Sequence, residues 1–260
     1  MIKTEKFDGM TKETEKCRGL TIERTTLFDE QVALEIGKKC GEYISIRFPY
    51  LFYEDKKVWN ALCKAIASEI KRLLDILNIK EKDLILIAGL GNSEFISDSV
   101  GPKSCAYIKD AISEKRVDGN ARSVYCIIPN TFCNAGINGG TTIRALANEI
   151  KPKAVLVIDS LAATTLKNFL GSIQINNTGI KPGVGFDNDF EELNADTLGV
   201  PIIAVGIPTL INIANIIADE FMSEIEGITD TIFVANKDID SRIEGLAYIL
   251  SNGITTALFE

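Results

Sequence analysis

The sequence predicts an α/β protein whose central sheet is mainly parallel and is flanked by helices on both faces. From residue 83 onward, apolar runs of strand length alternate with segments of helical periodicity, the pattern of βαβ units. The runs at 84–89 and 154–158 are apolar throughout, as strands covered on both faces usually are. The chain has 260 residues, of which 46% are hydrophobic, so it can bury a large core.

The N-terminal third is expected to add a layer to this sheet. Residues 1–18 are polar and rich in Lys, Glu and Thr, which predicts a mobile arm, and residues 19–260 are expected to form one domain. Asp29 is a suitable N-cap for a short helix. The elements expected after the arm are alternating strands at 19–27 and 42–48, a helix in 28–39, and a strongly amphipathic helix at 56–78.

The remaining elements follow from the alternation of patterns. Loops as long as 177–198 are uncommon unless they have a function, so this segment is a candidate part of a site. The expected order is a strand at 83–89, a helix from about Pro102, a strand at 123–130, a helix at 139–150, a strand at 154–160, a short helix from Leu161, an edge or antiparallel strand at 171–176, the loop 177–198, a strand at 201–208, a helix at 209–225, a strand at 230–236 and a helix at 239–258.

Composition narrows the classes of function. A formal net charge of −8 disfavours direct binding to nucleic acid or to an anionic membrane. No apolar run approaches the length of about 18 residues that spans a bilayer. Six cysteines without a CxxC pair, and no recognisable secretory leader, indicate reduced thiols in a cytoplasmic protein. The chain has no histidine, which excludes imidazole acid–base catalysis and histidine-ligated zinc sites.

The stretch "LILIAGLGNSEFISDSVGP", residues 84–102, places a glycine-rich turn after a buried strand. Gly89 and Gly91 suggest a dinucleotide fingerprint, but position 94 is Glu where the third glycine would stand. The next helix also begins about ten residues after the turn instead of directly behind it. The turn is therefore interpreted as a frame for Asp98, which lies just before the helix and could also act as its N-cap.

Asp159 ends the apolar run "AVLVID". The carboxyl ends of parallel strands form the edge where open α/β sheets bind ligands, so Asp98 and Asp159 can converge on one cleft. Two close carboxyl groups cannot easily both be charged, so one can serve as a base on water while the other donates a proton. The same two acids could instead hold a divalent cation together with water.

Several segments together resemble the germination protease family of spore-forming bacteria. They are "GLGNSEFISDSVGP", "VIDSLAATT", "SIQINNTGIKPGVG" and "LNADTLGVPIIAVGIPT", in matching order and spacing, with flanking resemblance from residue 19 to residue 260. The resemblance implies a three-layer fold like that of hydrogenase-maturation proteases. It also implies an atypical aspartic endopeptidase without cofactor or metal, whose catalytic aspartates fall on Asp98 and Asp159.

The resemblance further implies the biology of this family. Its members degrade small acid-soluble spore proteins during germination, in the cytoplasm of the spore core, and assemble as tetramers. The chain departs from the family pattern in four places. An Arg-Thr-Asp-Leu-Ala pattern near the N-terminus is absent, "SLAATT" lacks the usual arginine, and "GFDNDFEEL" carries acids where the family has basic residues. The insertion that the family usually has before the C-terminal segment is also missing. The changed loop and the missing arginine motivate one alternative, a non-catalytic relative that binds spore proteins or a sibling protease. A second alternative is a maturation-type protease whose acidic side chains recognise a metal in a client protein.

Five further residues are predicted to orient or bind the substrate. Asn92 lies in the glycine turn and can orient a carboxylate through a hydrogen bond. Thr178, Gly179, Gly183 and Gly185 lie in the loop that follows the strand at 171–176 and can line the site. Flexible turn chemistry is the alternative explanation for these loop residues.

Overall fold

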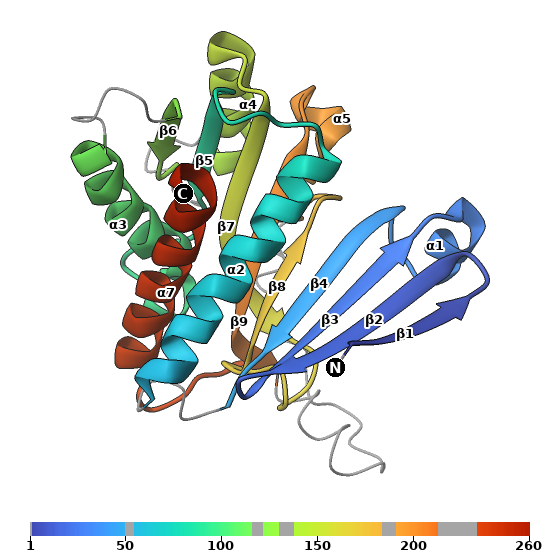
Figure 1. Cartoon of the computed structure of the whole chain (residues 1–260). Helices are drawn as coiled ribbons and strands as arrows, with labels where there is room; N and C mark the ends of the chain where they lie inside the picture. Colours follow the sequence, from blue (N-terminus) through green and yellow to red (C-terminus); the bar gives the residue numbers. More distant parts are fainter. Residues whose placement is uncertain (1, 50–54, 116–121, 130–137, 184–190, 213–232) are drawn as a thin grey trace.

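The computed structural model describes residues 2–49, 55–115, 122–129, 138–183, 191–212 and 233–260. In these ranges a ten-stranded sheet forms the centre of the molecule (Figure 1). Its strands are β1 (Ile2–Phe7), β2 (Met10–Cys17), β3 (Leu20–Leu27), β4 (Gly41–Arg47), β5 (Ile85–Gly89), β6 (Val124–Ile127), β7 (Ala154–Ala163), β8 (Ser172–Asn176), β9 (Ile202–Asn212) and β10 (Phe233–Val234).

Helices cover both faces of the sheet. On one face lie α2 (Lys56–Ile76), α3 (Val100–Lys115) and α7 (Ile239–Phe259), which pack with the sheet into the larger core. On the other face, α4 (Gly139–Ile150) and the short α5 (Ala195–Leu198) enclose a smaller core. A single 3-10 turn, η2 (Ile96–Asp98), precedes α3, and α1 (Glu30–Glu35) lies beside the N-terminal strands. None of the helices in the described ranges has the length and hydropathy to cross a membrane.

Local sequence signals explain where several helices begin and end. The Asp29 carboxylate accepts hydrogen bonds from two backbone N–H groups at the start of α1, which confirms the expected N-cap. Asp55 caps α2 through the N–H of Lys57 at 2.7 Å. At the other end of α4, Lys151 adopts the left-handed conformation before Pro152, which cannot continue a helix.

The order of strands corrects the expectation of a mainly parallel sheet. The order is β1-β2-β3-β4-β8-β9-β7-β5-β6, with β10 also paired to β9. Only the pairs β5–β6, β5–β7 and β7–β9 are parallel among the described strands, and the other pairs are antiparallel. The sheet is mixed because the N-terminal strands are joined by tight connections, which only antiparallel neighbours permit. The strand at 171–176 is antiparallel as expected, but it lies inside the sheet.

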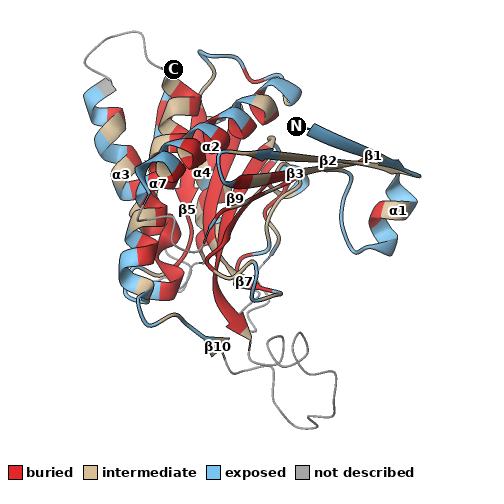
Figure 2. Ribbon diagram, turned by 60° about the horizontal axis from the view of Figure 1, so that its bottom comes forward, coloured by how far each residue is buried: buried red, intermediate tan, exposed pale blue. Residues whose placement is uncertain are grey.

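The polar N-terminus forms strands in place of the expected mobile arm. β1 and β2 pair as a hairpin around Asp8-Gly9, and β2 pairs with β3 along its whole length. Figure 2 shows that this end of the sheet is exposed or half-buried, whereas β5, β7 and β9 are buried. Both faces of the hairpin are exposed or half-buried, so its sequence lacks the alternating apolar residues from which a strand is predicted.

Two short segments were expected to be helical and are strands. β7 continues through Ala163, where a helix from Leu161 was expected, and β9 continues to Asn212, where a helix from Thr209 was expected. The two extensions pair with each other, so each strand end supplies the partner of the other. Residues 213–232, which hold the rest of that expected helix, lie outside the described ranges.

Candidate active site

Asp98 is held by the glycine turn that follows β5. Its Oδ2 accepts a hydrogen bond from the backbone N–H of Asn92 at 2.8 Å. Gly91 has φ +116°, and a Cβ built there would lie 1.9 Å from the backbone oxygen of Asp98. A side chain at position 91 would therefore force the turn away from the acid. The glycine at this position is explained by close approach of two backbone segments and not by a phosphate cradle.

Asp159 lies in β7. The last residue of β5, Gly89, pairs with Ile158, so Asp159 is the next residue of β7 after this pair. The backbone N–H of Leu90 donates to the carbonyl of Ile158 at 2.8 Å, which joins the start of the glycine turn to β7. Gly101, in the first turn of α3, is so close that a Cβ there would lie 2.6 Å from the same carbonyl oxygen. The turn that carries Asp98 and the strand that carries Asp159 therefore meet at the carboxyl ends of parallel strands, as the sequence predicted.

Both carboxyl groups are buried, with exposed fractions of 8% for Asp98 and 5% for Asp159. Burial raises the pKa of Asp98 to about 6, against the opposing effect of the hydrogen bond from Asn92. Burial also raises the pKa of Asp159 well above its ordinary value, and the charge of Asp98 raises this pKa further. The two acids are therefore close enough to influence each other's ionisation.

Neither acid is neutralised by a cation among the described residues, whose ion pairs lie elsewhere. The carboxyl group of Asp159 has a local partner: the N–H of Ser160 donates to its Oδ1 at 2.9 Å. A buried carboxyl without a counter-ion costs folding free energy when it is charged, which favours its protonated form. We call these two residues the aspartate pair.

Asn92 acts on Asp98 through its backbone. Its side-chain Oδ1 accepts a hydrogen bond from the N–H of Glu94 at 2.9 Å, and so stabilises its own turn. The carboxylate of Asp98 is bound by the N–H of Asn92, which any non-proline residue would supply. The side chain of Asn92 therefore shapes the loop, and the orienting group is the main chain.

The predicted loop residues form a separate turn. Oδ1 of Asn176 accepts hydrogen bonds from the N–H and hydroxyl of Thr178 and from the N–H of Gly179. Asn176 pairs with Ala204, two residues before the partner of Asp159 on β9. Since β9 runs parallel to β7, this turn lies towards the amino ends of the parallel strands. No contact among the described residues joins it to the aspartate pair.

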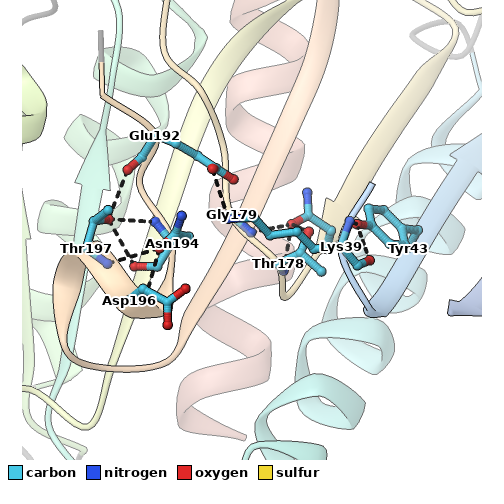
Figure 3. Close-up of polar contacts among 9 residues, drawn as sticks. Lys39, Tyr43, Thr178, Gly179, Glu192, Asn194, Asp196 and Thr197 are labelled. Atoms are coloured by element: carbon cyan, nitrogen blue, oxygen red, sulfur yellow. Dashed lines mark hydrogen bonds and ion pairs between the residues drawn. The ribbon is translucent and has the colours of Figure 1, made fainter. Parts of the chain in front are cut away.

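Gly183 adopts a positive φ of +72° in the same loop, and Gly185 lies outside the described ranges. Figure 3 shows how the second arm of the loop is fixed. Asn194 caps α5 through the N–H groups of Asp196 and Thr197, and the hydroxyl of Thr197 donates to the carbonyl of Glu192 at 2.9 Å. The loop is thus anchored at both ends of its described part.

The sequence did not single out Thr209. Its side chain is fully buried, and its hydroxyl donates to the backbone carbonyl of Ser97 at 2.6 Å, next to Asp98. The available signal was Pro208, because proline inside a strand pattern indicates a bulge or an edge. The apolar residues after Pro208 have helical spacing, and this spacing led to the prediction of a helix from Thr209 instead of a continued strand.

The aspartate pair can move protons without help from another side chain. Two carboxyl groups with separated pKa values can supply one base and one acid at the same pH. Among the described residues, no cluster of three or more His, Cys, Asp or Glu side chains is arranged to hold a metal ion. Two neighbouring carboxyl groups of this kind can carry out acid–base catalysis on a water molecule.

Comparisons with known proteins identify relatives along most of the chain. A family model described as "Germination protease" matches residues 2–226. The germination protease of Clostridium perfringens (strain ATCC 13124) is 29% identical over 277 residues, which cover 92% of this chain and 84% of that protein. The corresponding protein of Clostridium tetani (strain Massachusetts / E88) is 30% identical over 278 residues, covering 92% and 85%.

A third relative, the germination protease of Bacillus cytotoxicus, is 32% identical over 213 residues, which cover 80% of this chain and 58% of that protein. Among solved structures, a NiFe hydrogenase maturation protease, HycI, from Thermococcus kodakarensis KOD1 aligns with 71% of this chain and 99% of its own. The TM-score of that alignment is 0.40 and the sequence identity is 17%.

Proposed function

The chain belongs to the germination protease family, and we propose that it is an endopeptidase that uses the aspartate pair to cleave small acid-soluble spore proteins. One observation supports the mechanism above the others. Asp98 and Asp159 are buried beside each other, lack a cationic partner in the described ranges, and both have a pKa raised by burial.

The two carboxyl groups take different roles in this mechanism. Asp98, whose pKa is about 6, is ionised at neutral pH and acts as the base. Its carboxylate accepts a proton from water while the water oxygen attacks the peptide carbonyl carbon. Asp159, whose pKa is raised by burial and by the charge of Asp98, takes the protonated role and donates its proton to the leaving nitrogen as the C–N bond breaks. Transfer of one proton from Asp98 to Asp159 then restores the starting state.

The substrate class follows from membership of the family and from the sequence resemblance. Small acid-soluble spore proteins are the proposed substrates, with the spore core as the proposed place of action and a tetramer as the proposed assembly. The geometry of the aspartate pair supports the proposed chemistry and carries no information about the substrate, so substrate and chemistry need separate measurements.

The proposed substrate is tested by direct digestion. Purified protein is incubated with small acid-soluble spore proteins and, separately, with an unrelated unfolded protein of similar length, and the products are identified by mass spectrometry. Discrete internal cleavage of the spore proteins is expected, with slower cleavage of the unrelated protein. Binding of the spore proteins without any cleavage would contradict the proposal and would support a non-catalytic relative.

The pH dependence tests the assignment of roles. We expect kcat/KM to rise as the pH is raised through about 6, because Asp98 must lose its proton to act as the base. At higher pH kcat/KM should fall again, because Asp159 then loses the proton that it donates. The measurement is the pH profile of kcat/KM on a peptide substrate. A profile that stays flat between about pH 5 and about pH 7 would contradict the role of Asp98.

A further inference from the structure

Strand β9 carries one residue more than its neighbour β7 just beyond the aspartate pair. Leu161 of β7 pairs with Pro208 of β9. The next residue of β7, Ala162, pairs with Leu210, which leaves Thr209 as the extra residue. Such a β-bulge redirects the side chain that it carries, and bulges are frequent beside active sites.

The bulge directs the hydroxyl of Thr209 onto the turn that carries Asp98. Thr209 has no exposed surface, and its Oγ1 donates to the carbonyl of Ser97 at 2.6 Å. Ser97 is itself buried and immediately precedes Asp98 in the 3-10 turn η2. On its other side the bulge is held by Leu170, whose N–H donates to the carbonyl of Pro208 at 2.8 Å.

The same strand also lies beside Asp159, whose partner on β9 is Gly206. The hydrogen bonds that Asp98 makes within its own segment, to Asn92 and Phe95, shape the turn. The hydrogen bond from Thr209 attaches this turn to β9. Strand β9 therefore contacts both the turn that carries Asp98 and the strand that carries Asp159.

We infer that Thr209 is a positioning residue for the aspartate pair: its hydroxyl, presented by the bulge, fixes the Ser97–Asp98 turn against β9 and so sets the separation of the two carboxyl groups. This inference rests on the proposed function. A hydroxyl at this place does what an apolar side chain of the same shape cannot do, because the carbonyl of Ser97 needs a donor.

The test compares variants that keep and remove the hydroxyl. Thr209→Val preserves the shape and loses the donor, whereas Thr209→Ser keeps the donor and loses a methyl group. In Thr209→Val we expect kcat to fall about 10- to 100-fold with little change in KM, because small displacements of catalytic groups are that costly. Thr209→Ser should retain most of the wild-type kcat. Thr209→Ala is the second hydroxyl-free variant if Thr209→Val does not fold.

A readout independent of activity is the titration of the two carboxyl groups by carbon NMR. Burial raises the pKa of Asp159 in the wild-type protein, and the charge of Asp98 raises it further. If the turn is released, the two like charges separate, and the pKa of Asp159 should fall towards its ordinary value in the hydroxyl-free variants only.

Three results would overturn the inference. The first is a wild-type kcat in Thr209→Val. The second is an equal loss of kcat in Thr209→Ser, which would assign the effect to packing of the methyl group. The third is an unchanged titration of Asp159 in Thr209→Val. Failure of the proposed function has a different signature, namely wild-type cleavage by an Asp159→Asn variant, and the titration still decides the role of Thr209 in that case.

Discussion

Replacing Asp159 with asparagine is expected to lower kcat/KM by about 100- to 10,000-fold, the range associated with loss of a general acid or base. Asparagine keeps the shape of the side chain but cannot donate a proton in the manner of a carboxylic acid. Asp98→Asn should cause a loss of the same order, because its carboxylate is the proposed base. The measurement is kcat/KM on small acid-soluble spore proteins.

The same substitution should leave the protein folded and at least as stable at neutral pH. Because the folded pKa of Asp159 is raised above its unfolded value, the folded state binds this proton more tightly than the unfolded state. The resulting contribution to stability is greatest at low pH and is lost as the pH rises through the folded pKa. Asparagine does not ionise, so its burial carries no such pH-dependent loss of stability. The thermal midpoint at neutral pH should therefore be unchanged or higher.

A matched control is Asp110→Asn, which changes an exposed acid on α3. It should keep wild-type kcat/KM and a wild-type thermal midpoint. If Asp159→Asn cleaved spore proteins as fast as Asp110→Asn, the aspartate-pair mechanism would be wrong. A loss of activity accompanied by unfolding would leave Asp98→Asn as the deciding variant, because Asp98 lies in the 3-10 turn η2 and not inside a strand.

Replacing Glu69 with alanine is expected to lower the free energy of unfolding by about 3–5 kcal/mol, the cost of breaking a buried ion pair. Glu69 lies on α2 and is only 1% exposed. Its Oε1 accepts from Nε of Arg24 on β3 at 2.8 Å, and its Oε2 accepts from Nε of Arg72 at 3.1 Å. Removing Glu69 leaves Arg24, whose side chain is 14% exposed, with a weaker set of partners.

This network attaches the polar N-terminal strands to the core. Arg24 also pairs with Glu15 of β2 at 2.9 Å, and Arg72 pairs with Glu42 of β4 at 2.9 Å. The proximity of Glu69 raises the pKa of Arg24, as expected for a guanidinium held against a buried carboxylate. We therefore expect Glu69→Ala to loosen β2 and β3 before it affects the aspartate pair.

The free energy of unfolding is measured by urea denaturation, and amide hydrogen exchange locates the region that loosens. Asp75→Ala, an exposed acid on the same helix, is the control and should change stability by less than about 0.5 kcal/mol. A Glu69→Ala variant as stable as this control would show that the network does not stabilise the fold.

Much of the site could be predicted because its strands are recognisable from their apolar sequence. The apolar runs of β5 and β7 are long enough to be strands and too uniformly apolar to face water. Parallel neighbours end at the same edge, which brings Asp98 and Asp159 together without any knowledge of side-chain contacts. The glycine turn was interpreted correctly as a frame for the acid, and Gly91 shows the close approach that requires glycine.

Other features were not predictable from local pattern. The segment after Asp159 and the segment from Thr209 have compositions that suit a helix start, and mutual pairing made both of them strands. The polar N-terminal hairpin has no buried face, so its strands follow from pairing with β3 and from the ion pair between Glu15 of β2 and Arg24 of β3. The predicted contribution of Thr178 and Gly179 assumed that their loop reaches the aspartate pair, whereas the antiparallel direction of β8 carries it towards the other edge.

The sequence by itself determined the family, the two acids and the segments that form the buried strands, because motifs and hydrophobic periodicity are properties of contiguous residues. The tertiary structure decided the directions of the outer strands, the bulge at Thr209 and the raised pKa values of the aspartate pair. Each of these depends on groups far apart in the chain: strand direction on the choice of partner, the bulge on a carbonyl 112 residues away, and ionisation on how completely the surrounding elements exclude water.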